Sequence, residues 1–288
     1  MRFEGGPERA DKIALESCLK CKIDMFRSTV RKICQLFMET FLFLAFMRTF
    51  VMGDIHGAYR ALVQCLERSG FDRSVDTLIQ LGDVADGFEE VYACVEELMR
   101  IPRLIAIKGN HDEWLKQFLE TGYHPQGWNH GGAATARSYL KIIDKVDKLK
   151  FTGKGYKTAL NPADIPEHHE VFFQRQQLYH IGDDKVCYVH GGFNRHLAFR
   201  GQRPEVYYWD RDLWRDALTD AAGFRMVTRF KEIYIGHTST MQWKTDQPMK
   251  AVNIYNLDTG AGNAGRLTIM DVATKRCWQS DPVRELYG

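Results

Sequence analysis

Acidic and histidine side chains recur in five short motifs whose residue types suit a site for metal ions. The first three motifs are Gly53-Asp54-Ile55-His56-Gly57, Gly82-Asp83-Val84-Ala85-Asp86-Gly87 and Gly109-Asn110-His111-Asp112, and they are followed by His190-Gly191-Gly192 and Gly236-His237-Thr238. The six candidate ligands are Asp54, His56, Asp83, Asn110, His190 and His237. Oxygen and imidazole ligands without a thiolate suit Mn, Fe or Zn ions, and the flanking glycines allow the backbone to turn sharply beside them.

These residues also suggest a reaction. Two ions about 3.5–4 Å apart lower the pKa of a bridging water and bind a phosphoryl oxygen. His111 follows a candidate ligand and is placed to protonate the leaving oxygen, and Asp86 is placed to hold the tautomer of that imidazole. The pattern therefore suits hydrolysis of a phosphoester.

Strand-like apolar runs precede most of the motifs and would position them. We expect strands at 49–52, 76–81 and 104–107, alternating with helices at 59–69, 89–100 and 112–120. This alternation indicates a parallel sheet with the motifs at the carboxyl ends of its strands. The C-terminal part is richer in strands, with runs at 178–181, 185–189, 233–235, 252–257 and 266–271. Gly182-Asp183-Asp184 predicts a hairpin between the first two runs, and the whole pattern indicates one α/β catalytic domain.

From Met47 to about Asp271, the five motifs resemble the phosphoprotein phosphatase (PPP) family of calcineurin-like metallophosphoesterases, whose pattern is GDxHG, GDxxDRG, GNHD/E, HGG or HAG, and GH. The resemblance implies a metallophosphatase β-sandwich of two mixed sheets flanked by helices, so the sheet is not expected to be purely parallel. It also implies that Asp54, His56 and Asp83 hold one ion. The second ion would be held by Asp83, Asn110, His190 and His237, and His111 and Asp86 would form the acid dyad.

The same resemblance implies an enzyme with two divalent or trivalent ions (Mn, Fe or Zn). We expect it to hydrolyse phosphomonoesters by attack of a metal-bridging hydroxide, on a phosphoprotein or a small phosphoester, in the manner of a serine/threonine protein phosphatase. A dinucleoside polyphosphate (diadenosine tetraphosphate) hydrolase is the alternative, favoured a little by Leu257-Asp258-Thr259-Gly260. A non-catalytic interaction module is a third hypothesis. All six ligands and His111 are present, which argues against it.

One departure from the family pattern concerns phosphate binding, because Gly87 stands where the family has an arginine. Arg211, in Trp209-Asp210-Arg211-Asp212-Leu213-Trp214, is our first candidate to replace it, and Arg195 and Arg137 are weaker ones. A less regular stretch at about 122–167 is predicted to form a cap-like insert. Asn129, in Trp128-Asn129-His130-Gly131-Gly132, is predicted to contact substrate from this insert.

Composition limits the partners and the location. The formal net charge is +2, and residues 1–46 hold eight Lys/Arg and six Asp/Glu, so the rest of the chain is neutral. We therefore expect no nucleic-acid surface. The seven cysteines include Cys18-Leu19-Lys20-Cys21, which lacks a second pair, and free thiols favour a cytoplasmic protein.

Residues 33–46 are strongly apolar but too short to span a membrane, and they contain Glu39. We expect no membrane association. Met47 is predicted to begin the catalytic domain, 47–288, with 1–46 as an extension or a mis-assigned start. The alternatives for 1–46 are an accessory helix packed on the domain or a weak anchor.

Overall fold

The computed structural model describes residues 25, 29–33, 35, 47–153, 155–182, 184–220 and 229–288. Contacts between residues set Arg48–Gly288 apart as one compact unit. The apolar segment 33–46, except Ile33 and Gln35, lies outside the described residues, as do Cys18 and Cys21. Within the described ranges, no helix combines the length and the apolar character that crossing a membrane requires.

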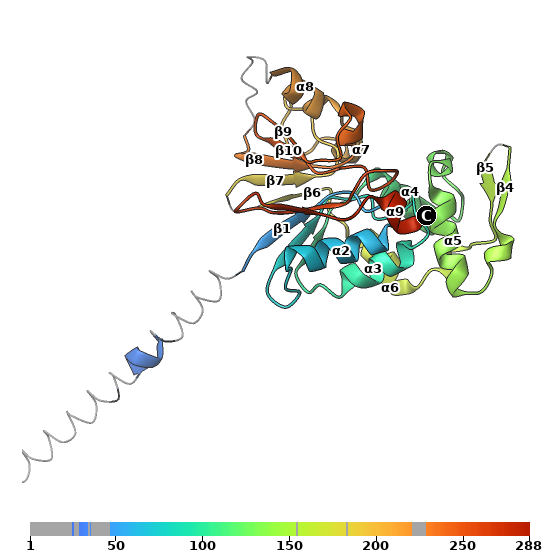
Figure 1. Cartoon of the computed structure of the whole chain (residues 1–288), viewed down its shortest axis with the longest axis horizontal. Helices are drawn as coiled ribbons and strands as arrows, with labels where there is room; N and C mark the ends of the chain where they lie inside the picture. Colours follow the sequence, from blue (N-terminus) through green and yellow to red (C-terminus); the bar gives the residue numbers. More distant parts are fainter. Residues whose placement is uncertain are drawn as a thin grey trace, which may run out of the picture. The chain divides into compact units, whose positions relative to one another are not determined.

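Two five-stranded sheets form the centre of this unit (Figure 1). The first has the order β12-β11-β1-β2-β3, formed by Cys277–Gln279, Thr268–Asp271, Thr49–Met52, Thr77–Gln80 and Leu104–Ala106. The second has the order β6-β7-β8-β10-β9, formed by Tyr179–Ile181, Val186–Val189, Glu232–Ile235, Ile254–Asn256 and Met249–Ala251. In the first sheet β1, β2 and β3 run parallel, while β11 is antiparallel to β1 and β12 is antiparallel to β11. In the second sheet the three central strands β7, β8 and β10 run parallel, and the edge strands β6 and β9 are antiparallel to their neighbours. The expected sandwich of mixed sheets is confirmed.

Successive side chains along a strand point to opposite faces of its sheet, and both faces are buried. In β1, Phe50 and Met52 join the core beneath the helices, whereas Val51 joins the core between the sheets. In β7, Val186 and Tyr188 face the first sheet while Cys187 and Val189 face the other way. Because neighbouring residues of a strand point to opposite faces, one short strand supplies two cores.

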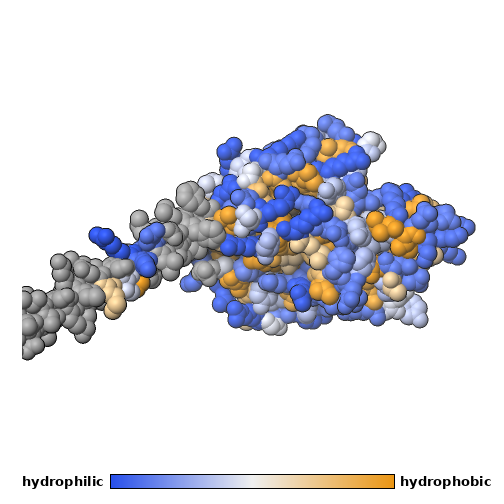
Figure 2. Space-filling view, turned by 90° about the horizontal axis from the view of Figure 1, so that it is seen from below, coloured by the Kyte–Doolittle hydropathy of each residue, from blue (hydrophilic) through white to orange (hydrophobic). Residues whose placement is uncertain are grey.

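Helices cover the outer faces of the sandwich. Those on the side of the first sheet are α2 (Tyr59–Ser69), α3 (Val91–Met99), α4 (Asn110–Thr121) and α6 (Glu167–Arg175). Those on the side of the second are α7 (Pro204–Trp209) and α8 (Asp212–Asp220), and Figure 1 shows these two on the opposite side of the strands from α2, α3 and α6. The space-filling view of the compact unit is mainly hydrophilic, with scattered apolar patches (Figure 2), as expected where amphipathic helices turn their polar faces outward.

The predicted insert contains its own small elements. It holds η1 (Gln126–Asn129), α5 (Gly132–Ile142), η2 (Val146–Lys148), η3 (Pro162–Asp164) and a two-stranded sheet of β4 (Lys150–Thr152) and β5 (Gly155–Lys157). α5 packs against α3, and β4 and β5 project at one end of the unit (Figure 1).

The sequence-based elements match the structure closely near the motifs and less well after them. The predicted hairpin is confirmed, because β6 and β7 pair antiparallel. The strand predicted at 252–257 is wrong in its extent, because Val252 adopts a φ of 52° and the chain turns there, so that β9 and β10 form a hairpin instead. The prediction did not include β12, α6, α7, α8, η4 (Thr240–Trp243) or α9 (Val283–Tyr287).

Candidate metal-binding active site

The structure brings the six candidate ligands to one place, where the carboxyl ends of strands from both sheets meet. Asp54 and His56 follow β1, Asp83 follows β2, and Asn110 begins α4. His190 directly follows β7, and His237 follows β8 after one glycine. Ligands that are far apart in sequence thus meet at the strand ends, where α/β folds place their binding sites.

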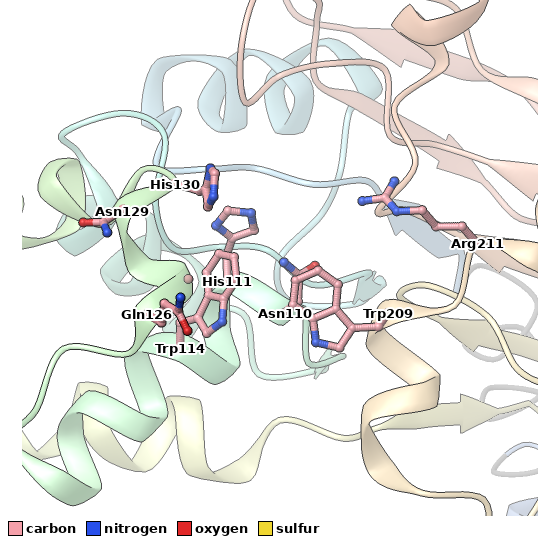
Figure 3. Close-up of a pocket in the computed structure, with 9 residues that line it drawn as sticks. Asn110, His111, Trp114, Gln126, Asn129, His130, Trp209 and Arg211 are labelled. Carbon is pink, nitrogen blue, oxygen red and sulfur yellow. The ribbon is translucent and has the colours of Figure 1, made fainter. Parts of the chain in front are cut away.

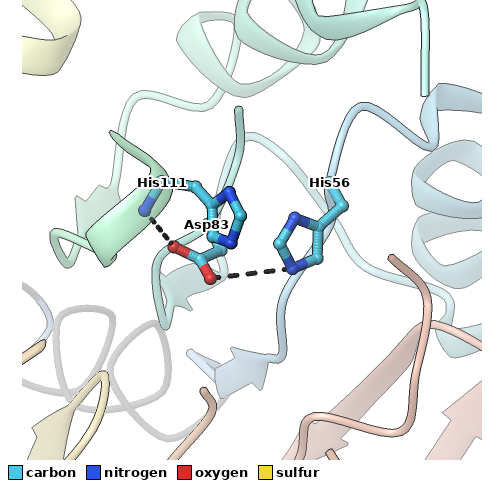
Figure 4. A group of neighbouring side chains, drawn as sticks. All are labelled: His56, Asp83 and His111. Atoms are coloured by element: carbon cyan, nitrogen blue, oxygen red, sulfur yellow. Dashed lines mark hydrogen bonds and ion pairs between the residues drawn. The ribbon is translucent and has the colours of Figure 1, made fainter. Parts of the chain in front are cut away.

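Asp83 lies at the centre of this group. Its Oδ2 is 3.6 Å from His56 Nε2, and its Oδ1 accepts a hydrogen bond from the backbone N–H of His111 at 2.9 Å (Figure 4). The same Oδ2 is 3.3 Å from His190 Nε2. The site contains two clusters that could each hold an ion, His56 with Asp83 and His111, and Asp83 with His190 and His237. Asp83 belongs to both clusters, which is the position that a bridging ligand needs.

Two buried polar atoms of the site have no hydrogen-bond partner, Asp54 Oδ1 and His237 Nε2. A buried polar atom without a partner costs free energy unless something else satisfies it. The two residues are neighbours, because the His237 backbone N–H donates to Asp54 Oδ2 at 3.0 Å. Gly236 permits this approach, since a Cβ there would lie 2.0 Å from Asp54 Oδ1. The donor set and its unsatisfied atoms therefore fit metal ions.

Backbone carbonyls orient two of the imidazoles. His190 Nδ1 lies 2.8 Å from the carbonyl oxygen of Leu81, and His56 Nδ1 lies 3.3 Å from that of Ala85. Each carbonyl can accept a hydrogen bond from the Nδ1–H of its ring, and the Nε2 atom of each ring lies on the side of Asp83. This arrangement is usual for histidines that bind metals.

Several buried carboxylates lie close together in the site, so positive charge would stabilise it. Burial raises the pKa of Asp54 well above its ordinary value, and repulsion from Asp258 and Asp83 raises it further. Burial likewise raises the pKa of Asp258, to about 6. Burial alone would also raise the pKa of Asp83, but attraction to His190, His111 and His56 holds it well below its usual range. Cations bound among these carboxylates would relieve their mutual repulsion.

His111 and Asp86 form a close pair. His111 Nδ1 lies 2.7 Å from Oδ2 of Asp86, which is fully buried. Burial by itself lowers the pKa of His111, but the charges of Asp83 and Asp86 outweigh it and raise that pKa to about 9. A protonated imidazole has no lone pair for a metal, so this environment supports a proton donor rather than a seventh ligand.

The insert holds Asp86 in place, a contact that the sequence analysis did not predict. Trp128 Nε1 donates to Asp86 Oδ1 at 2.9 Å, and Thr135 Oγ1 donates to the same oxygen at 2.7 Å. The Asp86 backbone N–H donates back to Thr135 at 2.8 Å. Trp128, expected among the cap residues near substrate, is instead fully buried behind the dyad.

Asp112 organises the loop after β2, although the sequence analysis gave it no role within the third motif. Its carboxylate accepts hydrogen bonds from five donors, the backbone N–H groups of Asp83, Val84, Ala85 and Gly109 and the side-chain amide of Gln176. Asp112 is fully buried, so these bonds fix the backbone that carries Asp83. The bond from Gly109 is a local contact at the start of α4, whereas the other four donors come from two distant segments of the chain.

A cavity of about 800 Å³ opens beside His111 and Asn110 (Figure 3). Arg211 lines it from one side and Asn129 and His130 from the other, with His111 between them (Figure 3). Arg211 donates to the His237 carbonyl oxygen and to Thr238 Oγ1, both at 3.2 Å. Among the residues that the structure describes, no other Lys or Arg lines this cavity.

The structure does not bring the other two candidate arginines to this cavity. Arg195 lines a separate cavity of about 260 Å³ and pairs with Asp216 at 2.9 Å. Arg137 pairs with Glu89. Its guanidinium also lies over the ring of Phe151.

Comparison with known proteins agrees with this geometry. The calcineurin-like phosphoesterase family matches residues 47–258. The chain belongs to this family. It is 24% identical to serine/threonine-protein phosphatase 1 of Salmonella typhimurium, over 76% of this chain and 89% of that protein. It is 22% identical to the symmetrical bis(5'-nucleosyl)-tetraphosphatase of Coxiella burnetii, over 81% of this chain and 92% of that protein.

A solved structure titled a putative diadenosine tetraphosphatase shares the fold, with a TM-score of 0.54 and 17% identity over 81% of this chain and 92% of that one. As a calcineurin-like phosphoesterase, the protein is a hydrolase that acts on phosphoester bonds. The family uses a binuclear metal centre, and the two clusters that share Asp83 are the candidate groups in this chain.

Proposed function

We propose that this protein is a phosphomonoesterase that needs two metal ions. Asp54, His56 and Asp83 would hold one ion, and Asp83, Asn110, His190 and His237 the other. The observation that best supports this proposal is that two buried atoms near Asp83, Asp54 Oδ1 and His237 Nε2, have no hydrogen-bond partner. When bound, the ions (Mn, Fe or Zn) would supply a water of lowered pKa and polarise the phosphoryl oxygen.

The chain's own groups would bind the ester and move one proton. Arg211 points its guanidinium into the cavity and would bind the non-bridging phosphate oxygens. His111, held protonated by Asp86, would give its proton to the leaving oxygen as the P–O bond breaks. Asn129, across the cavity from Arg211, would contact the remainder of the substrate.

Substrate comparisons test this function. Purified protein with Mn²⁺ is assayed on p-nitrophenyl phosphate, phosphopeptides and diadenosine tetraphosphate, with and without chelator. We expect chelator-sensitive hydrolysis of the monoesters to exceed that of the dinucleotide. Faster hydrolysis of diadenosine tetraphosphate would support the alternative function, to which the relatives of that name lend weight. Activity that survives chelation would overturn the proposed metal dependence, and inactivity on all substrates would favour an interaction module.

Two arginine variants separate the phosphate-binding role from general charge effects. Arg211→Gln removes the basic side chain of the cavity, and Arg195→Gln removes one that lies outside it. Because a hydrogen bond to a charged group contributes about 1.5–3 kcal/mol, we expect Arg211→Gln to lower kcat/KM about tenfold to a hundredfold. Arg195→Gln should leave it unchanged, and the reverse order would restore Arg195 as the phosphate ligand.

We further propose that residues 47–288 are the working domain and that 1–46 lie outside it. The compact unit Arg48–Gly288 and the family match from residue 47 support this division. Deletion of residues 2–46 should leave the unfolding temperature and turnover of the domain unchanged, and loss of either would contradict it. A cytoplasmic location is also proposed, because Cys65, Cys94 and Cys187 are buried free thiols.

A further inference from the structure

Two tryptophans, Trp114 and Trp209, form a wall of the cavity beside His111, which we call the tryptophan wall (Figure 3). The ring centroid of Trp114, from α4, lies 4.6 Å from that of His111. The ring of Trp209, from the end of α7, lies 5.5 Å from His237 and 5.5 Å from Trp114. The wall therefore adjoins both the candidate proton donor and a candidate metal ligand.

The tryptophan wall is partly open to solvent and held in position. Trp209 keeps 42% of its surface exposed at the edge of the cavity. Trp114 is fixed from behind by the insert, since a Cβ on Gly127 would lie only 2.2 Å from its indole ring. An exposed, rigid aromatic surface beside a few polar groups is the usual composition of a ligand pocket, and little entropy is lost when it binds.

We propose that the tryptophan wall binds the aromatic ring of an aryl phosphomonoester, such as a phosphotyrosine side chain. This inference rests on the proposed function, because it assumes hydrolysis at this site. Water would add its oxygen to phosphorus and release one proton to solvent, and the bond between phosphorus and the phenolic oxygen would break. The bonding electrons stay on that oxygen, which takes its proton from His111, so that the products are a phenol and inorganic phosphate.

The distance between His111 and Trp114 decides among the substrate classes. In an aryl phosphate the ring is bonded directly to the leaving oxygen, so it must lie beside the group that protonates that oxygen. Trp114 lies beside this group, with its ring centroid 4.6 Å from that of His111. In a dinucleoside polyphosphate, phosphate and ribose separate the base from the reacting oxygen, so the base would lie well beyond the wall. A phosphoserine offers only a methylene group to these indoles.

The test compares two peptides of one sequence that carry phosphotyrosine or phosphoserine at the same position. Wild-type protein, Trp209→Leu and Trp243→Leu are assayed with Mn²⁺. Trp243 is the control because it is also partly exposed, at 37%, but packs near Trp214 and does not line this cavity. The ratio of kcat/KM between the two peptides is compared between each variant and the wild type, and this comparison cancels the different intrinsic reactivities of the two esters.

We expect Trp209→Leu to lower the preference for phosphotyrosine about threefold to tenfold, the effect of losing one aromatic pair. Trp243→Leu should not change it. An equal fall on both peptides, or no fall on either, would overturn the inference. Absence of metal-dependent turnover on both peptides by the wild type would instead overturn the proposed function.

A second measurement does not depend on any variant. Phenylphosphonate and methylphosphonate are compared as inhibitors of the wild-type protein, since they differ only in the aromatic ring. Inhibition constants at least threefold lower for phenylphosphonate would support the tryptophan wall, and equal constants would overturn it.

Discussion

Trp128→Phe should slow hydrolysis of a phosphoserine peptide while leaving the metal content unchanged. The substitution removes the indole N–H that donates to Asp86 at 2.9 Å, and Asp86 is fully buried, so water cannot replace the bond. A hydrogen bond to a buried charged group contributes about 1.5–3 kcal/mol. Thr135 still holds the carboxylate, so part of this energy is kept, and we expect turnover to fall about tenfold, within the factor of about 10²–10⁴ that general acid catalysis supplies.

Trp214→Phe is the matched control for this prediction. Trp214 is also fully buried, but its indole nitrogen has no hydrogen-bond partner, so the same substitution removes similar volume and no hydrogen bond. A serine ester is used because its alkoxide leaving group needs a proton more than nitrophenolate does. Turnover and bound metal are measured for both variants. The reasoning fails if Trp128→Phe slows hydrolysis no more than Trp214→Phe, or if it loses metal.

Three further predictions concern His111 and Asp112. His111→Asn should lower turnover of the phosphoserine peptide about 10²–10⁴-fold with metal content unchanged, and unaltered turnover in steady-state assays would remove it as the acid. In metal-free protein, the NMR titration of the His111 ring should have its midpoint near pH 9, since its pKa is raised to about 9. The stabilisation of the protonated ring by Asp83 and Asp86 is then complete below about pH 6.5 and is lost as the pH rises through 9, so a midpoint at or below 6.5 would contradict these interactions. Asp112→Asn should lower the free energy of unfolding by about 3–6 kcal/mol, because at least two backbone donors lose a charged acceptor. Urea denaturation measures this change, and a loss below about 1 kcal/mol would refute the role given to Asp112.

The sequence was most informative where a functional residue follows a strand directly. Asp54, Asp83 and His190 each come one to three residues after a short apolar run, and the carboxyl ends of those runs meet in the folded sandwich. The local sequence pattern indicates where a strand ends and which residue follows it. The position of such a residue in the fold could therefore be predicted without knowing its neighbours in space.

The supporting contacts could not be predicted because they join distant segments. Trp128 and Thr135 lie 42 and 49 residues from Asp86, and Gln176 lies 64 residues from Asp112. Nothing in the pattern around these residues distinguishes them from ordinary core or loop residues. Their roles depend on how the insert folds back over the site, and only tertiary packing determines that.

Gly87, which stands where the family pattern has an arginine, is closely packed against both His56 and the insert. Gly87 has a φ of 77°, and a Cβ there would lie 2.8 Å from both the Cβ and the carbonyl oxygen of His56, so a larger residue would displace a candidate metal ligand. From the other side, a Cβ on Gly131 would lie 2.9 Å from the Gly87 nitrogen. The turn after Asp86 is therefore packed closely between His56 and the insert, and the same insert contributes the hydrogen bond from Trp128 to Asp86. An arginine at position 87 is incompatible with that arrangement, so the positive charge for phosphate must come from another element, and Arg211 faces the cavity from the side of the second sheet.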